Sequence, residues 1–147
     1  MKRITSAVLL LVFFSIAAFA NPPEVSEKVL KIFHETYTTA AEVKWYTYEQ
    51  YYEATFKQND IPVTVRYDTD GNIISSKRYY SGQQLNPFVA GKLKARYGDK
   101  TIFGVTEWTS ADGTAYHVVL EDEKFWWNVK ADANGEVETT EKIKKGK

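Results

Sequence analysis

Two stretches of the chain share one pattern: YDTDGNII at residues 67–74 and ADANGEVE at residues 131–138 lie 64 residues apart. At this offset Asp68 aligns with Asp132 and Gly71 with Gly135. Upstream, the same offset pairs a proline and six core-type residues: Pro23 with Pro87, Val25 with Val89, Val29 with Leu93, Phe33 with Tyr97, Tyr52 with Tyr116, Phe56 with Leu120 and Val65 with Val129. The pattern predicts two copies of one supersecondary unit.

Each copy is predicted to begin with a helix. In the second copy, Asn86 can cap the helix, Pro87 suits its first turn and Gly98 can end it. Apolar residues recur at helical spacing in both copies and form one stripe each: Val25, Val29, Ile32 and Phe33, then Val89, Leu93 and Tyr97. Such stripes are typical of helices that pack on a core.

Strand-like runs with period-two alternation follow each predicted helix. They span about residues 43–48, 51–57, 61–68 and 73–80 in the first copy, and 104–109, 115–121, 124–132 and 136–143 in the second. The connections are short, which favours antiparallel hairpins. We therefore expect an α+β fold of two tandem α-β-β-β-β repeats, with the helices packed on one face of an antiparallel sheet of about eight strands. The sequence leaves open which strands pair between the copies.

A single copy would bury only a modest core. We therefore expect the first repeat, residues 21–84, and the second, residues 85–147, to form one cooperative domain.

The first twenty residues are typical of a secretory signal. Lys2 and Arg3 give a positive start, residues 7–14 are apolar, and Ala18-Phe19-Ala20 forms a small-x-small cleavage site. The alternative is a membrane anchor, but the apolar run is short for a span. We expect cleavage after Ala20, a periplasmic or secreted product, and no stable membrane insertion after cleavage.

The charge balance argues against nucleic acid as a partner. Loss of Lys2 and Arg3 with the signal leaves 17 basic residues against 19 acidic ones, a net charge of −2. Nucleic-acid-binding proteins present a basic patch or stripe instead. The sequence also contains no cysteine, which excludes a disulfide framework.

The two Asp-x-Asx-Gly loops raise the question of a calcium site. An EF-hand beginning at Asp68 requires glycine at its sixth position and an acidic residue at its twelfth, where this chain has Ile73 and Tyr79. The second copy has Val137 and Ile143 at these positions. A hairpin turn requires only the Asp, Asn and Gly that are present, so we expect turns and no metal.

No motif points to catalysis. His34 and His117 lie in different copies with no metal-ligand spacing between them, so each is expected at the surface. The sequence lacks a Gly-x-Ser-x-Gly elbow and a glycine-rich phosphate loop. We therefore expect a non-enzymatic protein with no cofactor, and a hydrolase remains a minor alternative.

Aromatic residues give the one candidate site. If Phe125, Trp127 and Val129 face the helix, Trp126 must face the other way. The same alternation predicts an outward face that carries Tyr46, Tyr48, Tyr51, His117, Val119 and Trp126. Exposed aromatic residues on a rigid sheet are typical of protein-binding surfaces. Two alternatives stay open: β-propensity alone can place Tyr and Trp on strands, or a dimer can cover them.

The chain resembles the PepSY-like proteins of bacterial envelopes, whose tandem fold is similar to the β-lactamase inhibitory protein. The resemblance is carried by Val43-x-Trp45, Tyr52-x-Ala54-x-Phe56, Tyr67-Asp68-x-Asp70-Gly71, Tyr116-x-Val118-x-Leu120 and Asp132-x-Asn134-Gly135. In the second copy Glu107-Trp108 departs from the Val-x-Trp register, and the inhibitory protein's disulfides are absent. The resemblance implies a sheet face that grips another protein.

The leading hypothesis is a secreted, non-enzymatic module that binds an envelope protein through this sheet face. A peptidase is one candidate partner, in which case the protein would act as an inhibitor; alternatively, the protein would be an assembly partner of an envelope protein. The rival hypothesis is a carrier or sensor of a small peptide or glycan that uses the same aromatic face, which would require a concave pocket.

Overall fold

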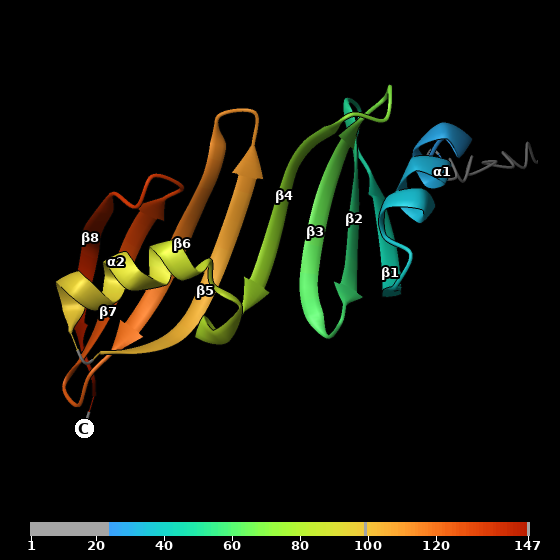
Figure 1. Ribbon diagram of the computed structural model, residues 1–147. Coiled ribbons are helices and arrows are strands. Elements are labelled where there is room, and N and C mark those ends of the chain that lie inside the picture. The colour runs from blue at the N-terminus through green and yellow to red at the C-terminus, as the bar shows by residue number, and fades with distance from the viewer. Residues whose placement is uncertain (1–23, 99, 147) are drawn as a thin grey trace, which may run out of the picture.

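A single antiparallel sheet of eight strands dominates the computed structural model (Figure 1), which describes residues 24–98 and 100–146. Each strand pairs with the next in chain order. The strands are β1 (Ala40–Thr47), β2 (Tyr51–Gln58), β3 (Ile61–Asp68), β4 (Ile73–Tyr80), β5 (Thr101–Ser110), β6 (Gly113–Glu121), β7 (Phe125–Asp132) and β8 (Val137–Lys144). The expected signal peptide and its cleavage after Ala20 lie outside the described residues.

The expected fold class was wrong. Strands hold about 55% of the described residues and helices about 20%, so the protein is a β-dominated meander with two short helices and not an α+β fold of two tandem α-β-β-β-β repeats. The sheet runs on without a break from β4 to β5, where Ser75 pairs with Ser110 and Tyr80 with Val105. Both helices are short, and each supplies only two fully buried side chains to the core.

The two helices begin and end at residues that satisfy their free backbone groups. Helix α1 (Glu27–Thr36) has Ser26 at its N-cap, where the hydroxyl accepts a hydrogen bond from the Val29 amide at 3.4 Å. Helix α2 (Pro87–Tyr97) follows the short 3₁₀ helix η1 (Gly82–Gln84). Its predicted cap, Asn86, accepts from the Phe88 amide at 2.9 Å, and Gly98 ends it with φ of 65°. The predicted limits of α2 are confirmed.

The hydrophobic core has two parts. Val29 and Phe33 of α1 pack on β2 and β3, in a cluster with Ala54, Phe56, Val63, Val65 and Tyr67. Val89 and Leu93 of α2 pack mainly on β5, β6 and β7, in a cluster with Tyr80, Leu85, Val105, Tyr116, Val118, Leu120, Val129 and Ala131. Ile61 contacts both clusters. The two parts are joined by β4 and β5, which pair with each other in the middle of the sheet.

The two Asp-x-Asx-Gly loops form hairpin turns of the same kind, as predicted. One carboxylate oxygen of Asp68 accepts hydrogen bonds from the amides of Asp70 and Asn72 at 2.9 and 2.8 Å. Asp132 accepts from the amides of Asn134 and Glu136, both at 2.9 Å. These hydrogen bonds, together with those of the Asn72 and Asn134 side chains, lower the pKa of both aspartates. In each turn the aspartate carboxylate thus accepts hydrogen bonds from backbone amides of the turn residues.

Helix α2 can be stabilised at Gly91. A Cβ added there would meet nothing within 4 Å, so alanine fits without a clash. Because glycine loses more backbone freedom than alanine on entering a helix, Gly91→Ala is expected to raise the free energy of unfolding by about 0.5–1 kcal/mol. Urea denaturation would measure this gain. An unchanged or lower midpoint would mean that α2 contributes nothing to the cooperative unit.

Candidate functional site

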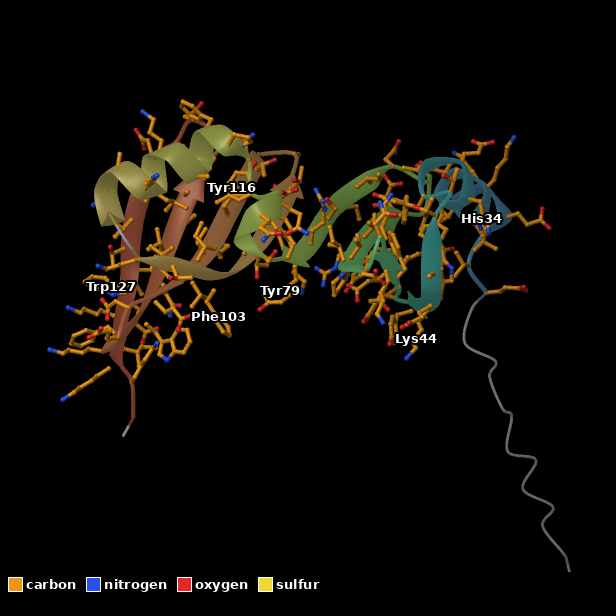
Figure 2. The ribbon with its side chains drawn as sticks, turned by 60° about the horizontal axis from the view of Figure 1, so that its bottom comes forward. His34, Lys44, Tyr79, Phe103, Tyr116 and Trp127 are labelled. Carbon is orange, nitrogen blue, oxygen red and sulfur yellow. The ribbon has the colours of Figure 1, made fainter. Side chains whose placement is uncertain are left out.

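The sheet has one face that the helices leave uncovered, which we call the open face. Alternate residues of a strand point to opposite faces. Both core clusters use the same face, since Arg78 and Tyr80 on β4 lie opposite Val63 of one cluster and Val105 of the other. In Figure 2, Tyr116 lies beneath α2, whereas Tyr79 and Phe103 project from the other side of the sheet. Residues whose neighbours along the strand face the core therefore point to the open face.

Three of the predicted residues gather at the β1–β2 end of the open face. The rings of Tyr48 and Tyr51 are stacked, with centroids 4.4 Å apart. Tyr46 is exposed and lies opposite Glu53 on β2. The guanidinium of Arg66 lies 5.2 Å from the centre of the Tyr51 ring and donates to Glu53 at 2.7 Å. This hydrogen bond raises the pKa of Arg66, so the group stays a cation within an aromatic cluster.

The other predicted residues lie towards the far end of the face. Trp126 on β7 is half-buried and lies opposite Glu121 on β6 and Ile143 on β8. Val119 is half-buried and His117 is exposed, and both point to the open face. Lys145 places its ammonium 4.3 Å from the Trp126 ring and 2.7 Å from a Glu121 oxygen. This end therefore combines an aromatic anchor with a paired charge.

Sequence reasoning missed Phe103, which is 56% exposed and meets Trp126 edge to face with ring centroids 4.8 Å apart. The predicted strand began at about residue 104, whereas β5 begins at Thr101. A bulge brings Phe103 to the open face: Ile102 pairs with Leu120 and Gly104 with Val119, which leaves Phe103 as the extra residue. The sequence signal was Gly104, because glycine inside a strand marks a bulge or a close approach. Here the Tyr79 hydroxyl lies 2.8 Å from where a Cβ of residue 104 would stand.

The six predicted residues share one face but do not form one patch. Tyr46, Tyr48 and Tyr51 belong to the β1–β2 end, whereas His117, Val119 and Trp126 lie on β6 and β7. Four strand spacings separate β2 from β6, which at about 4.8 Å each makes roughly 19 Å. The structure thus divides the predicted face into an N-terminal aromatic group, Tyr46, Tyr48 and Tyr51, and a C-terminal aromatic group, Phe103 and Trp126.

The middle of the open face, between the two groups, holds one small cavity among those found in the described residues. Trp108 lies opposite Lys77 on β4 and Ala115 on β6, near the middle of the sheet. A small cavity of about 90 Å³ opens there, lined by Glu53, Thr64, Arg66, Ser75, Lys77 and Trp108. Ligand pockets usually enclose about 300–1,000 Å³. The cavity between these residues is therefore several times smaller than a usual small-molecule site.

The described residues hold no group of three or more His, Asp or Glu side chains placed to bind a metal ion. His34 and His117 are both exposed, as expected. His34 lies on α1 beside Phe33, on the helix side of the sheet, so it contributes nothing to the open face. Across residues 24–98 and 100–146, no helix is both long and apolar enough to span a bilayer.

Comparison with solved structures places this architecture among BLIP-like folds. A BLIP-like protein from Bacteroides fragilis matches with a TM-score of 0.62 at 16% identity, over 85% of this chain and 91% of that one. A candidate periplasmic protein from Bacteroides eggerthii has a TM-score of 0.58 at 16% identity, over 83% and 90% of the two chains. A DUF2874 family protein from Bacteroides uniformis has a TM-score of 0.57 at 18% identity, over 82% and 90%.

No family model matches the sequence, and no curated protein matches it. The solved structures support the expected likeness to the fold of the β-lactamase inhibitory protein (BLIP), while membership of the PepSY-like family stays a prediction. At these identities the likeness concerns the fold alone. The function has to be argued from the surface of this chain.

Proposed function

We propose that the protein is a non-enzymatic module of the bacterial envelope that binds another protein through the open face of its sheet. The observation that carries the proposal is the open face itself: the helices leave it uncovered, and it presents the N-terminal and C-terminal aromatic groups. Protein–protein interfaces of standard size are wide enough to cover both aromatic groups at once. The hot spots of such interfaces are enriched in Trp, Tyr and Arg. Arg66, stacked on Tyr51, adds the third of these residue types.

The shape of the face favours a protein partner over a small ligand. A carrier of a peptide or glycan needs a concave pocket, and the open-face cavity of about 90 Å³ is several times too small. A protein partner needs breadth, which eight paired strands provide. The cavity on this face is therefore too small for the rival hypothesis, in which the same face carries a small peptide or glycan.

The BLIP-like fold supports an inhibitor as the finer form of the proposal, with an envelope peptidase as the candidate partner. The predicted signal peptide and the likeness to a candidate periplasmic protein support a periplasmic or secreted site of action. We place the protein with the PepSY-like proteins on the motifs quoted above. The inhibitor proposal is tested by capturing the partner.

The test is affinity capture from an envelope extract of the source organism, followed by measurement of binding to the purified partner. Tyr51→Ala and Trp126→Ala are each expected to weaken binding by at least tenfold, because truncating an aromatic hot spot costs about 2 kcal/mol or more. The effects should multiply in the double variant, because sites this far apart act independently. Thermal stability should change little, since neither side chain belongs to a core cluster.

The matched control is Tyr37→Ala. Tyr37 packs on Phe33 and Phe56 on the helix side of the sheet, so its loss should lower stability and leave binding unchanged. A partner that binds the Tyr51→Ala and Trp126→Ala double variant as tightly as the original protein would show that the open face is not the binding surface.

A further inference from the structure

A second candidate site lies on the opposite side of the sheet, away from the open face. A cavity of about 540 Å³ opens between η1, the C-terminal half of α2 and the start of β5. Its apolar lining includes Leu93, Tyr97, Ile102 and Leu120, and two lysines, Lys94 and Lys100, also line it. This volume lies within the usual range of small-molecule sites, and the mixture of an apolar wall with a few charged groups is typical of them.

The apolar walls of this cavity are fixed by packing. Leu93 and Leu120 belong to the core cluster and are only 2% and 1% exposed. The Tyr97 hydroxyl forms a hydrogen bond of 2.7 Å with the Thr139 hydroxyl, which holds the ring in place. Gly82 lies so close to Ile102 that an added Cβ would stand 2.8 Å from the Ile102 Cβ. The cavity is therefore preformed, and a ligand would not need to reorganise the fold.

One of the two lysines is held in place at the rim. The Lys100 ammonium lies 4.7 Å from the centre of the Trp127 ring, and its side chain is only 19% exposed. Its contact with the Asp122 carboxylate is 3.7 Å long, beyond hydrogen-bond distance. Asp122 instead accepts from the amides of Lys124 and Phe125 at 2.9 and 2.7 Å. The Trp127 indole donates to it at 2.8 Å.

The hydrogen bonds from Lys124, Trp127 and Phe125 lower the pKa of Asp122 to about 2. The carboxylate is therefore ionised at neutral pH, but its oxygens already have partners. Lys100 also lines an adjoining cavity of about 630 Å³, whose other charged lining residues are Lys124, Lys142 and the carboxylates Glu121, Asp122 and Glu123. The Lys100 side chain thus lines both cavities, and its ammonium can donate hydrogen bonds to a ligand.

We propose that the cavity between η1, α2 and β5 binds a small amphipathic anion, with an apolar body against Leu93, Ile102 and Leu120 and a terminal carboxylate at Lys94 and Lys100. An apolar chain gains free energy when it leaves water and packs against such a wall. A carboxylate gains charge-assisted hydrogen bonds from the lysines. This site is separate from the open face and does not depend on the function proposed for it.

The C-terminal end of α2 lies at this cavity, so the sign of the charge that a ligand carries tests the proposal. A helix C-terminus carries partial negative charge, which by itself would favour a cation. The anion is preferred only if Lys94 and Lys100 outweigh that effect. Decanoate, decanol and decyltrimethylammonium share one apolar chain and differ in the charge of the head group, so they separate the apolar contribution from the electrostatic one.

Isothermal titration calorimetry on the purified protein, below the micelle concentration of each compound, is the experiment. Decanoate is expected to bind at least tenfold more tightly than decanol, and decyltrimethylammonium more weakly than either. Lys94→Gln and Lys100→Gln should each weaken decanoate binding several-fold and leave decanol unaffected. Lys92→Gln is the matched control, because Lys92 lies on α2 over the Phe88 ring and does not line the cavity.

A variant that fills the cavity completes the design. Ala90 lines the cavity from α2 and is half-buried, so Ala90→Phe is expected to abolish decanoate and decanol binding. The two glutamine variants keep the proposal testable if Ala90→Phe does not fold. The proposal is overturned if decanoate does not bind the original protein, if it binds no more tightly than decanol, or if both glutamine variants bind it unchanged.

Discussion

Replacing Phe33 with alanine is expected to lower the free energy of unfolding by about 3–5 kcal/mol, the usual cost of removing a buried aromatic ring. Phe33 is completely buried on α1. Its ring lies edge to face with those of Trp45 and Phe56, with both pairs of centroids 5.1 Å apart. Because α1 contributes only Val29 besides Phe33 to the buried core, no neighbour on the helix can fill the space.

The same variant tests whether the chain is one cooperative domain. Trp45 reports on the cluster beneath α1, whereas Trp127 packs against the cluster beneath α2. Since β4 and β5 are paired along six residues each, we expect both clusters to unfold together. Urea unfolding of single-tryptophan variants would then give coincident transitions, and both would move to lower urea in Phe33→Ala.

His34→Ala is the natural control for Phe33→Ala. His34 is the next residue on α1 and is exposed, so its removal should cost far less. If Trp45 and Trp127 gave separate transitions, the domain prediction would be wrong, and residues 21–84 and 85–147 would unfold as independent units.

A second large effect is expected at alkaline pH. Burial raises the pKa of Tyr67, Tyr80, Tyr37 and Tyr116 above the ordinary value of 10.0, and Glu107 raises that of Tyr80 further by accepting its hydroxyl hydrogen bond at 2.5 Å. These phenols stay protonated in the fold while they ionise in the unfolded chain. Their contribution to stability is complete below pH 10 and is lost as the pH rises towards the folded pKa values.

The loss should be steep, because each tyrosine with a raised pKa contributes about 1.4 kcal/mol per pH unit above 10. Tyrosine absorbance at 295 nm, followed together with far-ultraviolet circular dichroism, would measure it. The buried phenols are expected to ionise in the same step as the fold is lost. Ionisation of all ten tyrosines at one ordinary pKa in a chain that keeps its circular dichroism would contradict the expectation.

Tyr67→Phe separates the hydroxyl from the ring in this experiment. The Tyr67 hydroxyl is buried without a hydrogen-bond partner among the described residues. Removing it should raise stability at neutral pH by about 1–3 kcal/mol, the cost of a buried unsatisfied polar group. It should also reduce the loss of stability above pH 10. Tyr46→Phe is the control, since Tyr46 is 46% exposed and should show neither effect.

Local structure followed the sequence closely. Helix α2 begins after Asn86 and ends at Gly98 as predicted, because capping depends on the side chain and backbone freedom of those two residues. The two Asp-x-Asx-Gly turns were equally predictable, since Asp68 and Asp132 bond to amides within four residues. Every strand limit fell within about three residues of the prediction. In each case the decisive contacts are near in sequence.

The candidate site was only partly predictable. Alternation put Tyr51 and Trp126 on the open face, but it made no prediction for Phe103, which lies before the predicted strand at residues 104–109. A bulge at Phe103 adds one residue to β5 and so changes which residues face each side. The six residues taken as one surface fall into two groups, since three strands lie between β2 and β6. Neither fact can be read from the alternation within a single strand.

What the sequence alone determined was local: the caps of α2, the turns at Asp68 and Asp132, and the alternation that separates a core face from an open face. What only the tertiary structure decided was the β-dominated fold class, the unbroken pairing of β4 with β5, and the cavity beneath α2. The physical reason is range. A cap or a turn is stabilised by atoms a few residues apart, whereas sheet order and cavities depend on contacts between distant segments.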